Sequence, residues 1–308
     1  MSFLSALPGN IAQGIIWGLM GLGVFLTFKL LNFADLSVDG SFATGGAVTA
    51  VMLIKGCPVW ATIIVAILAG LAAGLVTGLL HTLLGIPDIL AGILTQIALY
   101  SINLNIMGKS NLPISYRNYT LVVSASNINM AILVGLGICA VVVAAMYWYF
   151  GTEQGSTIRS TGSNPAMSKA QGININFTKV IALALSNGLV ALSGSLFAQY
   201  QGFADINMGR GAIVIGLAAV IIGEVLGEAI FRKHMNFIIR MLFVIVGGIL
   251  YYIAMGIVLW LKMPTDDTKL FTAIIVAIFL AVPYLQKKRK TSFKKVAKMN
   301  AKNAQKEG

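Results

Sequence analysis

Long apolar runs without charge recur along this chain, and they restrict its fold more than any other feature. Residues 59–70, for example, read VWATIIVAILAG, with no alternation of apolar and polar side chains. A membrane span needs about 20 mostly apolar residues, and backbone groups in lipid must bond within their own segment, so such runs form helices rather than β-barrel strands. Because only 10% of the 308 residues are charged, against about 25% in a soluble domain, we predict an all-α, polytopic integral membrane protein.

Hydrophobicity divides the chain into nine segments, which corresponds to about 8–10 transmembrane helices. The second and seventh segments are rich in glycine and begin beside acidic residues, so we expect broken or re-entrant helices there. The segments lie at roughly 10–31, 36–54, 59–84, 88–107, 127–150, 177–200, 211–231, 236–261 and 268–286.

The C-terminal tail, residues 287–308, contains nine Lys or Arg residues and one Glu. Basic residues favour the cytoplasmic side of a membrane, so we predict a cytoplasmic tail that orients the chain and contacts anionic lipid. Since Phe293 is its one aromatic residue, the tail offers no stacking platform and no nucleic-acid partner is expected. Alternation of the spans then places the polar stretch 151–176 inside and the N-terminus outside.

A short motif occurs twice, 170 residues apart, as FADLS at 33–37 and FADIN at 203–207. Each copy precedes a Gly-containing turn and an apolar run of small residues. An offset of five spans inverts the second copy, and inverted repeats with broken helices are typical of transporters. The predicted organisation is a transmembrane domain at 1–286, with a first repeat at about 10–107, a linking span at 127–150, and a second repeat at about 177–286.

Asp35, Asp39 and Asp205 lie beside the glycine-rich starts of the segments that follow the two motifs. An acid at a helix N-terminus stabilises the helix by about 0.3–1 kcal/mol, which is one sufficient reason for these residues. Acids inside a membrane also mark solute pathways, and both interpretations remain open at this point. The predicted translocation path comprises Phe33, Asp35, Ser37, Asp39, Ser41, Phe203, Asp205 and Asn207.

The stretch 151–176, GTEQGSTIRSTGSNPAMSKAQGININ, is a long polar interruption between two apolar segments. Within it, an Asn cap precedes a Pro at the first helical position, and a Gly follows residues that favour a helix. We predict a short helix along the membrane face, with Met167 and Ala170 available to enter a groove of a partner; a solvated connecting loop is the alternative. The predicted docking residues are Asn164, Pro165, Ala166, Met167, Ser168, Lys169, Ala170, Gln171 and Gly172.

The sequence contains no G-x-x-x-x-G-K-[ST] motif, so it has no phosphate-binding loop of that kind. His81 and His234 belong to no triad or metal-ligand cluster in the sequence. We therefore predict no catalytic residues, cofactor or metal, and an ATPase that drives transport would be a separate polypeptide. A secondary transporter driven by an ion gradient is the alternative, because it also has inverted repeats and broken helices.

Three further patterns each have a structural and a functional interpretation. Glycines at every fourth position in 70–78 allow close helix packing, either within the chain or between copies. Glu224 and Glu228, followed by Arg232, form either an exposed ion pair on one helix or an acidic edge for a cytoplasmic partner. Amides within the spans either line a polar path or bond across helices: Gln96, Asn103, Asn105, Asn187 and Gln199.

Two stretches carry a family resemblance. They read GLGVFLTFKLLNFADLSVDGSFATGGAV at 21–48 and RSTGSNPAMSKAQGININFTKVIALALSNGLVALSGSLFAQYQGFADINMGRGAIVIGLAAVIIGE at 159–224. Both resemble the permease subunits of bacterial ABC importers in the branched-chain amino acid and ribose transporter superfamily. The resemblance spans about 20–285 and is most specific at 162–172 and 188–194. Within the superfamily, the chain is similar to permeases paired with lipoprotein-like binding proteins, a group that includes tryptophan importers.

The resemblance implies a multi-pass permease of the bacterial cytoplasmic membrane that imports a small solute. An amino acid is the favoured solute, with sugar or nucleoside permeases as alternatives. The implied partners are a second permease copy in a homodimer, two cytoplasmic ATPase subunits and an extracytoplasmic solute-binding protein. The resemblance also identifies Asn164–Gly172 as the coupling helix within the loop 151–176, and it places the translocation path near 33–46 and 203–216.

Overall fold

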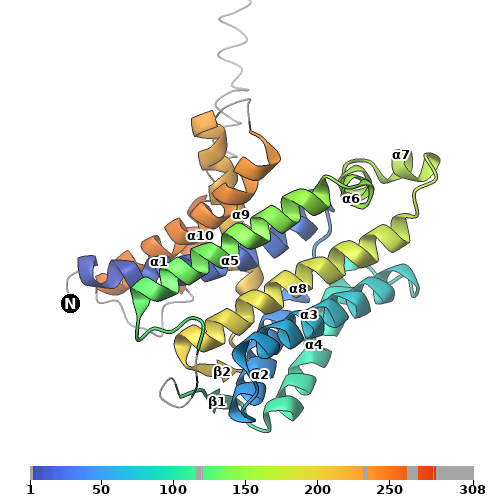
Figure 1. Cartoon of the computed structure of the whole chain (residues 1–308). Coiled ribbons are helices and arrows are strands. Elements are labelled where there is room, and N and C mark those ends of the chain that lie inside the picture. The colour runs from blue at the N-terminus through green and yellow to red at the C-terminus, as the bar shows by residue number, and fades with distance from the viewer. Residues whose placement is uncertain are drawn as a thin grey trace, which may run out of the picture.

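The computed structural model describes residues 3–115, 119, 121–231, 235–261, 270–279 and 281. It is a bundle of tilted helices with one small antiparallel pair of strands (Figure 1). The elements are α1 (Phe3–Val24), the π-helix η1 (Phe25–Leu30), α2 (Val38–Ile54), α3 (Val59–Thr82), α4 (Asp88–Met107), β1 (Asn111–Pro113), α5 (Ile128–Phe150), α6 (Glu153–Ser163), α7 (Pro165–Ala170), α8 (Ile175–Gln201), β2 (Phe203–Asp205), α9 (Ala212–Phe231) and α10 (Phe237–Trp260).

Seven helices in the described part of the chain are long and apolar enough to cross a membrane. This confirms the prediction of a polytopic helical membrane protein. The second predicted segment is the 17-residue helix α2, which is shorter than a full span, as expected for a broken element. The seventh, also expected to be broken, is instead the continuous 20-residue helix α9. Of the last segment, the structure describes a helix at Leu270–Phe279.

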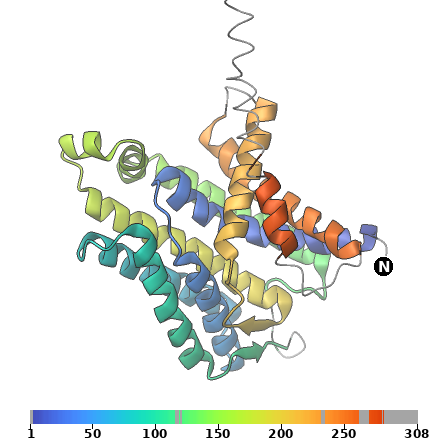
Figure 2. The same ribbon diagram turned by 180° about the vertical axis from the view of Figure 1, so that it is seen from behind.

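α8 and α2 form the centre of the larger group of helices. α8 packs against α1, α2 and α3, and α2 packs against α3, α4 and α8. Figure 2 shows α2 between α8 and α4. Most residues of α2 are buried, so protein rather than lipid surrounds it. This explains how a short helix with several hydroxyl groups is accommodated within an apolar domain.

Glycines let the backbones of these helices approach closely. A Cβ at Gly45 would overlap the carbonyl of Ala191, and a Cβ at Gly194 would overlap the carbonyl of Phe42. The α2–α8 crossing therefore requires glycine on both helices.

The glycine stripe of α3 has the same role at the neighbouring crossing. Cβ atoms at Gly70 and Gly74 would overlap the carbonyls of Asn187 and Leu183 on α8. Of the two interpretations offered by the sequence, packing within the chain is confirmed for these glycines.

The strands β1 and β2 form an antiparallel pair in which Asn111 lies opposite Asp205. They join the segment after α4 to the segment after α8. The prediction of an all-α protein did not include this pair of three-residue strands. The first three residues of the second motif copy form β2, so the strand pair fixes one end of the segment that leads to α9.

The N-terminal end of α1 and the polar helices α6 and α7 lie at opposite ends of the bundle (Figure 1). This arrangement agrees with the predicted placement of the N-terminus and the stretch 151–176 on opposite sides of the membrane. The predicted basic tail, 287–308, and Arg232 lie outside the described residues. The division into two inverted repeats stays a prediction.

Replacement of Gly45 by valine is expected to separate α2 from α8, because the added side chain has no space beside the carbonyl of Ala191. Overpacking of this kind costs about 1–3 kcal/mol or more. A matched control is Gly137→Val on α5, since a Cβ at Gly137 meets nothing within 4 Å. Thermal unfolding in detergent should show a clearly lower Tm for the first variant only, and equal Tm values would contradict the role assigned to this crossing.

Candidate functional site

The first helix leaves α-helical geometry well before α2 begins. It continues as η1, in which the N–H of Leu31 donates to the carbonyl of Leu26 over 3.0 Å, five residues back. Asn32 then adopts a left-handed conformation with a φ of 56°, and the chain runs without helical hydrogen bonds to Asp35. Backbone polar groups released inside a membrane domain need other partners. The motif at 33–37 supplies one of them.

Asp35 is 2% exposed, and its carboxylate accepts three hydrogen bonds. Its Oδ1 accepts from the backbone N–H of Ser37 at 2.9 Å and from the Ser37 hydroxyl at 2.5 Å. Its Oδ2 accepts from Nδ2 of Asn187 at 2.8 Å. A buried carboxylate is tolerated only with such donors. The bond to Asn187 ties the break after η1 to the middle of α8.

Asn187 links this turn to α2 as well. Its Oδ1 accepts from the hydroxyl of Ser41 at 2.6 Å, and its Nδ2 also donates to the carbonyl of Leu183 at 3.0 Å. Asn187, Ser37 and Ser41 are all completely buried. This amide therefore bonds across helices, which was one of the two interpretations left open by the sequence. We call Asp35, Ser37, Ser41 and Asn187 the buried polar cluster.

Asp39 caps a helix other than its own. Its Oδ2 accepts from the N–H of Gly211 at 2.9 Å, and its Oδ1 accepts from the N–H of Ile213 at 2.8 Å. These N–H groups lie at the start of α9, where no intrahelical acceptor exists. A carboxylate at that position also interacts favourably with the helix dipole. Asp39 thus joins the N-terminal end of α2 to the N-terminal end of α9.

The second motif repeats the local geometry of the first. Oδ1 of Asp205 accepts from the N–H of Asn207 at 2.7 Å, as Oδ1 of Asp35 does from Ser37. Its surroundings differ, because Oδ2 of Asp205 accepts from the side-chain amide of Asn111 in β1, at 3.3 Å, and Asn207 is exposed. The two copies of the motif therefore share a local turn but have different surroundings.

Phe33 and Phe203 also occupy different environments. Phe33 is buried against the edge of the His81 ring, with the ring centroids 5.0 Å apart. Phe203 is partly buried at the start of β2. The role of the eight residues as a translocation path stays a prediction, and Asp39 is the member that lines a cavity.

The predicted helix of the polar stretch is present as α7. Oδ1 of Asn164 accepts from the N–H of Met167 at 3.1 Å, Pro165 occupies the first turn, and Gly172 follows with a φ of 81°. Met167 is 58% exposed, whereas Ser168 is buried. Ala170 is also exposed. The helix and its cap are confirmed, and its docking role stays a prediction.

A second helix in the polar stretch 151–176, α6, was not predicted. It begins after Thr152, whose hydroxyl accepts from the N–H of Gly155 at 3.4 Å. A Cβ at Gly155 would overlap the backbone at Tyr149 and Phe150, and a Cβ at Gly162 would overlap the carbonyl of Leu30. α6 thus packs directly on the end of η1. Threonine before an acidic first turn was the sequence signal that could have located it.

Glu224 of α9 pairs with η1 rather than with its own helix. Its Oε2 lies 2.8 Å from Nζ of Lys29, and this is the ion pair found among the described residues. The sequence had offered Glu228 and Arg232 as the ion pair of this region, and Arg232 lies outside the described residues. η1 is therefore held by α6 on one side and by α9 on another.

Comparison with known proteins assigns the family. Residues 9–283 match the family described as "Branched-chain amino acid transport system / permease component". The chain belongs to this family. It is a permease subunit of an ABC importer and a multi-pass protein of the cytoplasmic membrane. This confirms the resemblance found in the sequence and favours it over an ion-coupled secondary transporter.

Relatives cover nearly the whole permease. It is 42% identical to a tyrosine transport system permease protein of Clostridioides difficile, across 97% of this chain and 99% of the relative. It is 31% identical to an uncharacterised protein of Rickettsia prowazekii, across 87% and 94%. The solved structure "PsaBC from Streptococcus pneumoniae in complex with Fab" shares the fold, with a TM-score of 0.53 and 16% identity over 92% of this chain and 91% of that chain.

Asn187→Leu should destabilise the permease, because Asp35 and Ser41 would each lose a buried hydrogen-bond partner. Loss of a hydrogen bond to a charged group costs about 1.5–3 kcal/mol in free energy of unfolding. The matched control is Asn105→Leu, since Asn105 is exposed on α4 and has no side-chain hydrogen bond among the described residues. Denaturant unfolding in detergent measures both variants, and equal stability would show that the cluster contributes little.

Proposed function

We propose that the permease imports an amino acid, with aromatic amino acids such as tyrosine as the preferred class. The observation that carries this proposal is the 42% identity to a tyrosine permease over almost the full length of both chains. Sugar and nucleoside permeases are more distant relatives. The D-allose permease of Escherichia coli is 24% identical, and the nucleoside permease of Lactococcus lactis matches over only 91 residues.

The proposed energy source is ATP, hydrolysed by two partner subunits that dock at α7. Its exposed Met167 and Ala170 lie at the polar end of the bundle, apart from the lipid-facing surfaces of α3, α4 and α5. α6 connects this helix to η1 through the contact of Gly162 with Leu30. We therefore expect a movement of α7 to be transmitted through α6 to η1, which ends just before the break that precedes α2. A second permease copy and an extracytoplasmic binding protein complete the proposed assembly.

The complete transporter in proteoliposomes should take up radiolabelled L-tyrosine when ATP is supplied on the side of the membrane where the ATPase subunits lie. Excess D-ribose or uridine should not compete, because neither carries the charged groups of an amino acid. Uptake driven by an ion gradient without ATP, or competition by ribose alone, would contradict the proposed function. Liposomes that lack the ATPase provide the control.

Met167→Asp should reduce both co-purification of the ATPase and ATP-dependent uptake by about tenfold or more. Burial of a methionine side chain in a partner groove stabilises the contact by about 1.5–3 kcal/mol, and a buried carboxylate would remove that contribution. Met167→Leu keeps an apolar side chain at the same position and serves as the matched control. Normal assembly and uptake by the aspartate variant would rule out docking through this residue.

A further inference from the structure

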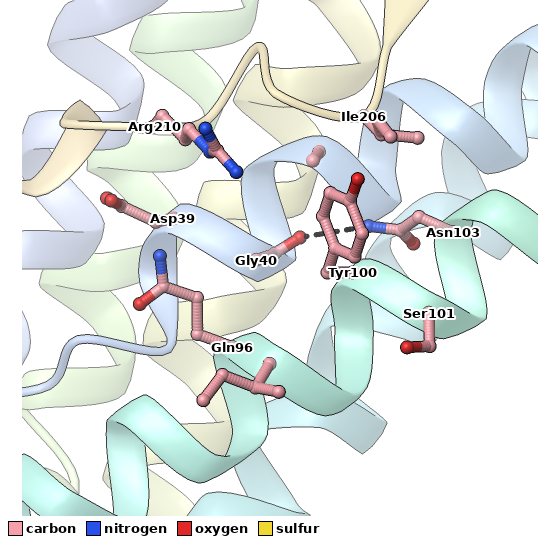
Figure 3. A pocket seen from close by; sticks show the side chains of 10 residues that line it. Asp39, Gly40, Gln96, Tyr100, Ser101, Asn103, Ile206 and Arg210 are labelled. Carbon is pink, nitrogen blue, oxygen red and sulfur yellow. Dashed lines mark hydrogen bonds between the residues drawn. The ribbon is translucent and has the colours of Figure 1, made fainter. Parts of the chain in front are cut away.

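A cavity of about 350 Å³ opens between the start of α2, one face of α4 and the turn that precedes α9. Figure 3 shows Asp39 and Arg210 on one side of this cavity and Tyr100 and Asn103 on the other. Its volume lies within the range of about 300–1,000 Å³ that is common for small-molecule sites. Its lining combines charged, amide and aromatic side chains, and Arg210, Tyr100 and Ser101 are exposed there.

Among the residues that the structure describes, Arg210 forms no ion pair with a carboxylate. Arg210 and Asp39 line the same cavity, but no guanidinium nitrogen lies within 4.0 Å of a carboxylate oxygen of Asp39. Figure 3 shows the Arg210 side chain extending from its turn towards the space between Asp39 and Tyr100. A guanidinium group binds a carboxylate through two parallel hydrogen bonds. The position of Arg210 therefore suits an acidic group on a solute.

Asp39 supplies an acceptor beside the same cavity. It uses one lone pair on each carboxylate oxygen for the N–H groups of Gly211 and Ile213, which leaves further acceptor capacity. Asn103 is completely buried, and its Nδ2 donates to the carbonyl of Gly40 at 3.5 Å, so this amide forms part of the cavity wall. An ammonium group offers three N–H donors.

Together these groups fit a zwitterion better than a neutral solute. A sugar would leave both the guanidinium and the carboxylate without a charged partner, whereas an α-amino acid carries one charge of each sign. Tyr100 and Ile97 provide aromatic and apolar surface for the side chain of the solute. Asp39 also caps α9, so an ammonium bound there would contact the junction of α2 and α9.

We infer that this cavity is a transient binding station for an α-amino acid on its way through the permease. Arg210 binds the carboxylate, and Asp39 accepts from the ammonium group. This inference rests on the proposed function, because it specifies where and by which groups the permease contacts its solute. The station determines which zwitterions pass after release from the binding protein.

The test uses cysteine protection in the assembled transporter without its binding protein. Ser101 lines the cavity, so Ser101→Cys is labelled with a polar thiol reagent in a Cys57→Ser background; the other native cysteine, Cys139, is buried. Millimolar L-tyrosine should slow labelling at least about threefold, whereas tyramine and N-acetyl-L-tyrosine should not. Equal protection by tyramine, which lacks the carboxylate, would overturn the role given to Arg210.

Arg210→Gln should abolish protection and raise the KM for L-tyrosine uptake at least about tenfold, because a charge-assisted pair is lost. Arg210→Lys retains the charge without the planar fork and should restore part of the protection, which distinguishes recognition from misfolding. Lys109→Gln removes an exposed charge that does not line the cavity and should change neither measurement. Unchanged protection in the Arg210→Gln variant would overturn the station.

Failure of the proposed function gives a different result. If the wild-type transporter shows no ATP-dependent uptake of any amino acid, the substrate class is wrong. If it takes up L-tyrosine but the amino acid gives no protection of the cysteine at position 101, the function stands and the station is wrong.

Discussion

The hydrogen bond from Asn187 to Asp35 secures the point at which the chain leaves helical geometry inside the membrane domain. Neither lipid nor an apolar side chain can satisfy a carboxylate, so the break after η1 is stable only where α8 supplies an amide. The same amide accepts from Ser41 and thereby fixes the start of α2. With α2 in place, Asp39, the second residue of this helix, reaches the start of α9. The central arrangement of α2, α8 and α9 follows from this one polar contact.

The end of the bundle that carries α6 and α7 is connected to that contact through closely packed backbone. α6 approaches the end of η1 at Gly162, and Lys29 of η1 pairs with Glu224 of α9. Glycine at such crossings permits main-chain contact, which transmits a rigid displacement better than long side chains would. An ATPase acting on α7 would thus move η1, and η1 leads within a few residues to Asp35. In our proposal, this is how the energy of ATP reaches the solute cavity.

Local sequence patterns predicted several parts of this arrangement. The Asn164 cap, Pro165 and Gly172 defined α7 correctly, because capping and backbone preferences act within a few residues. Hydrophobic runs predicted the membrane spans, because the polarity of consecutive residues decides whether a segment can lie in lipid. α6 was missed because its polar, Gly-containing sequence has no apolar periodicity, and it is held by contacts with η1 and the end of α5. The strands were missed because each has three residues and depends on a partner far away in sequence.

The sequence by itself determined the membrane location, the type of most helices, the short capped helix in the polar stretch 151–176 and, through resemblance, the permease family. The spans and the capped helix depend on the polarity and backbone preferences of residues that are neighbours in the sequence. The family assignment depends on the order of the residues in the two matching stretches. Only the tertiary structure decided that Asn187 is the partner of Asp35, 152 positions away, and that Arg210 and Asn103 face one cavity with Asp39. Helix packing sets those distances, and the glycine contacts that set the packing involve backbone atoms of both helices at once.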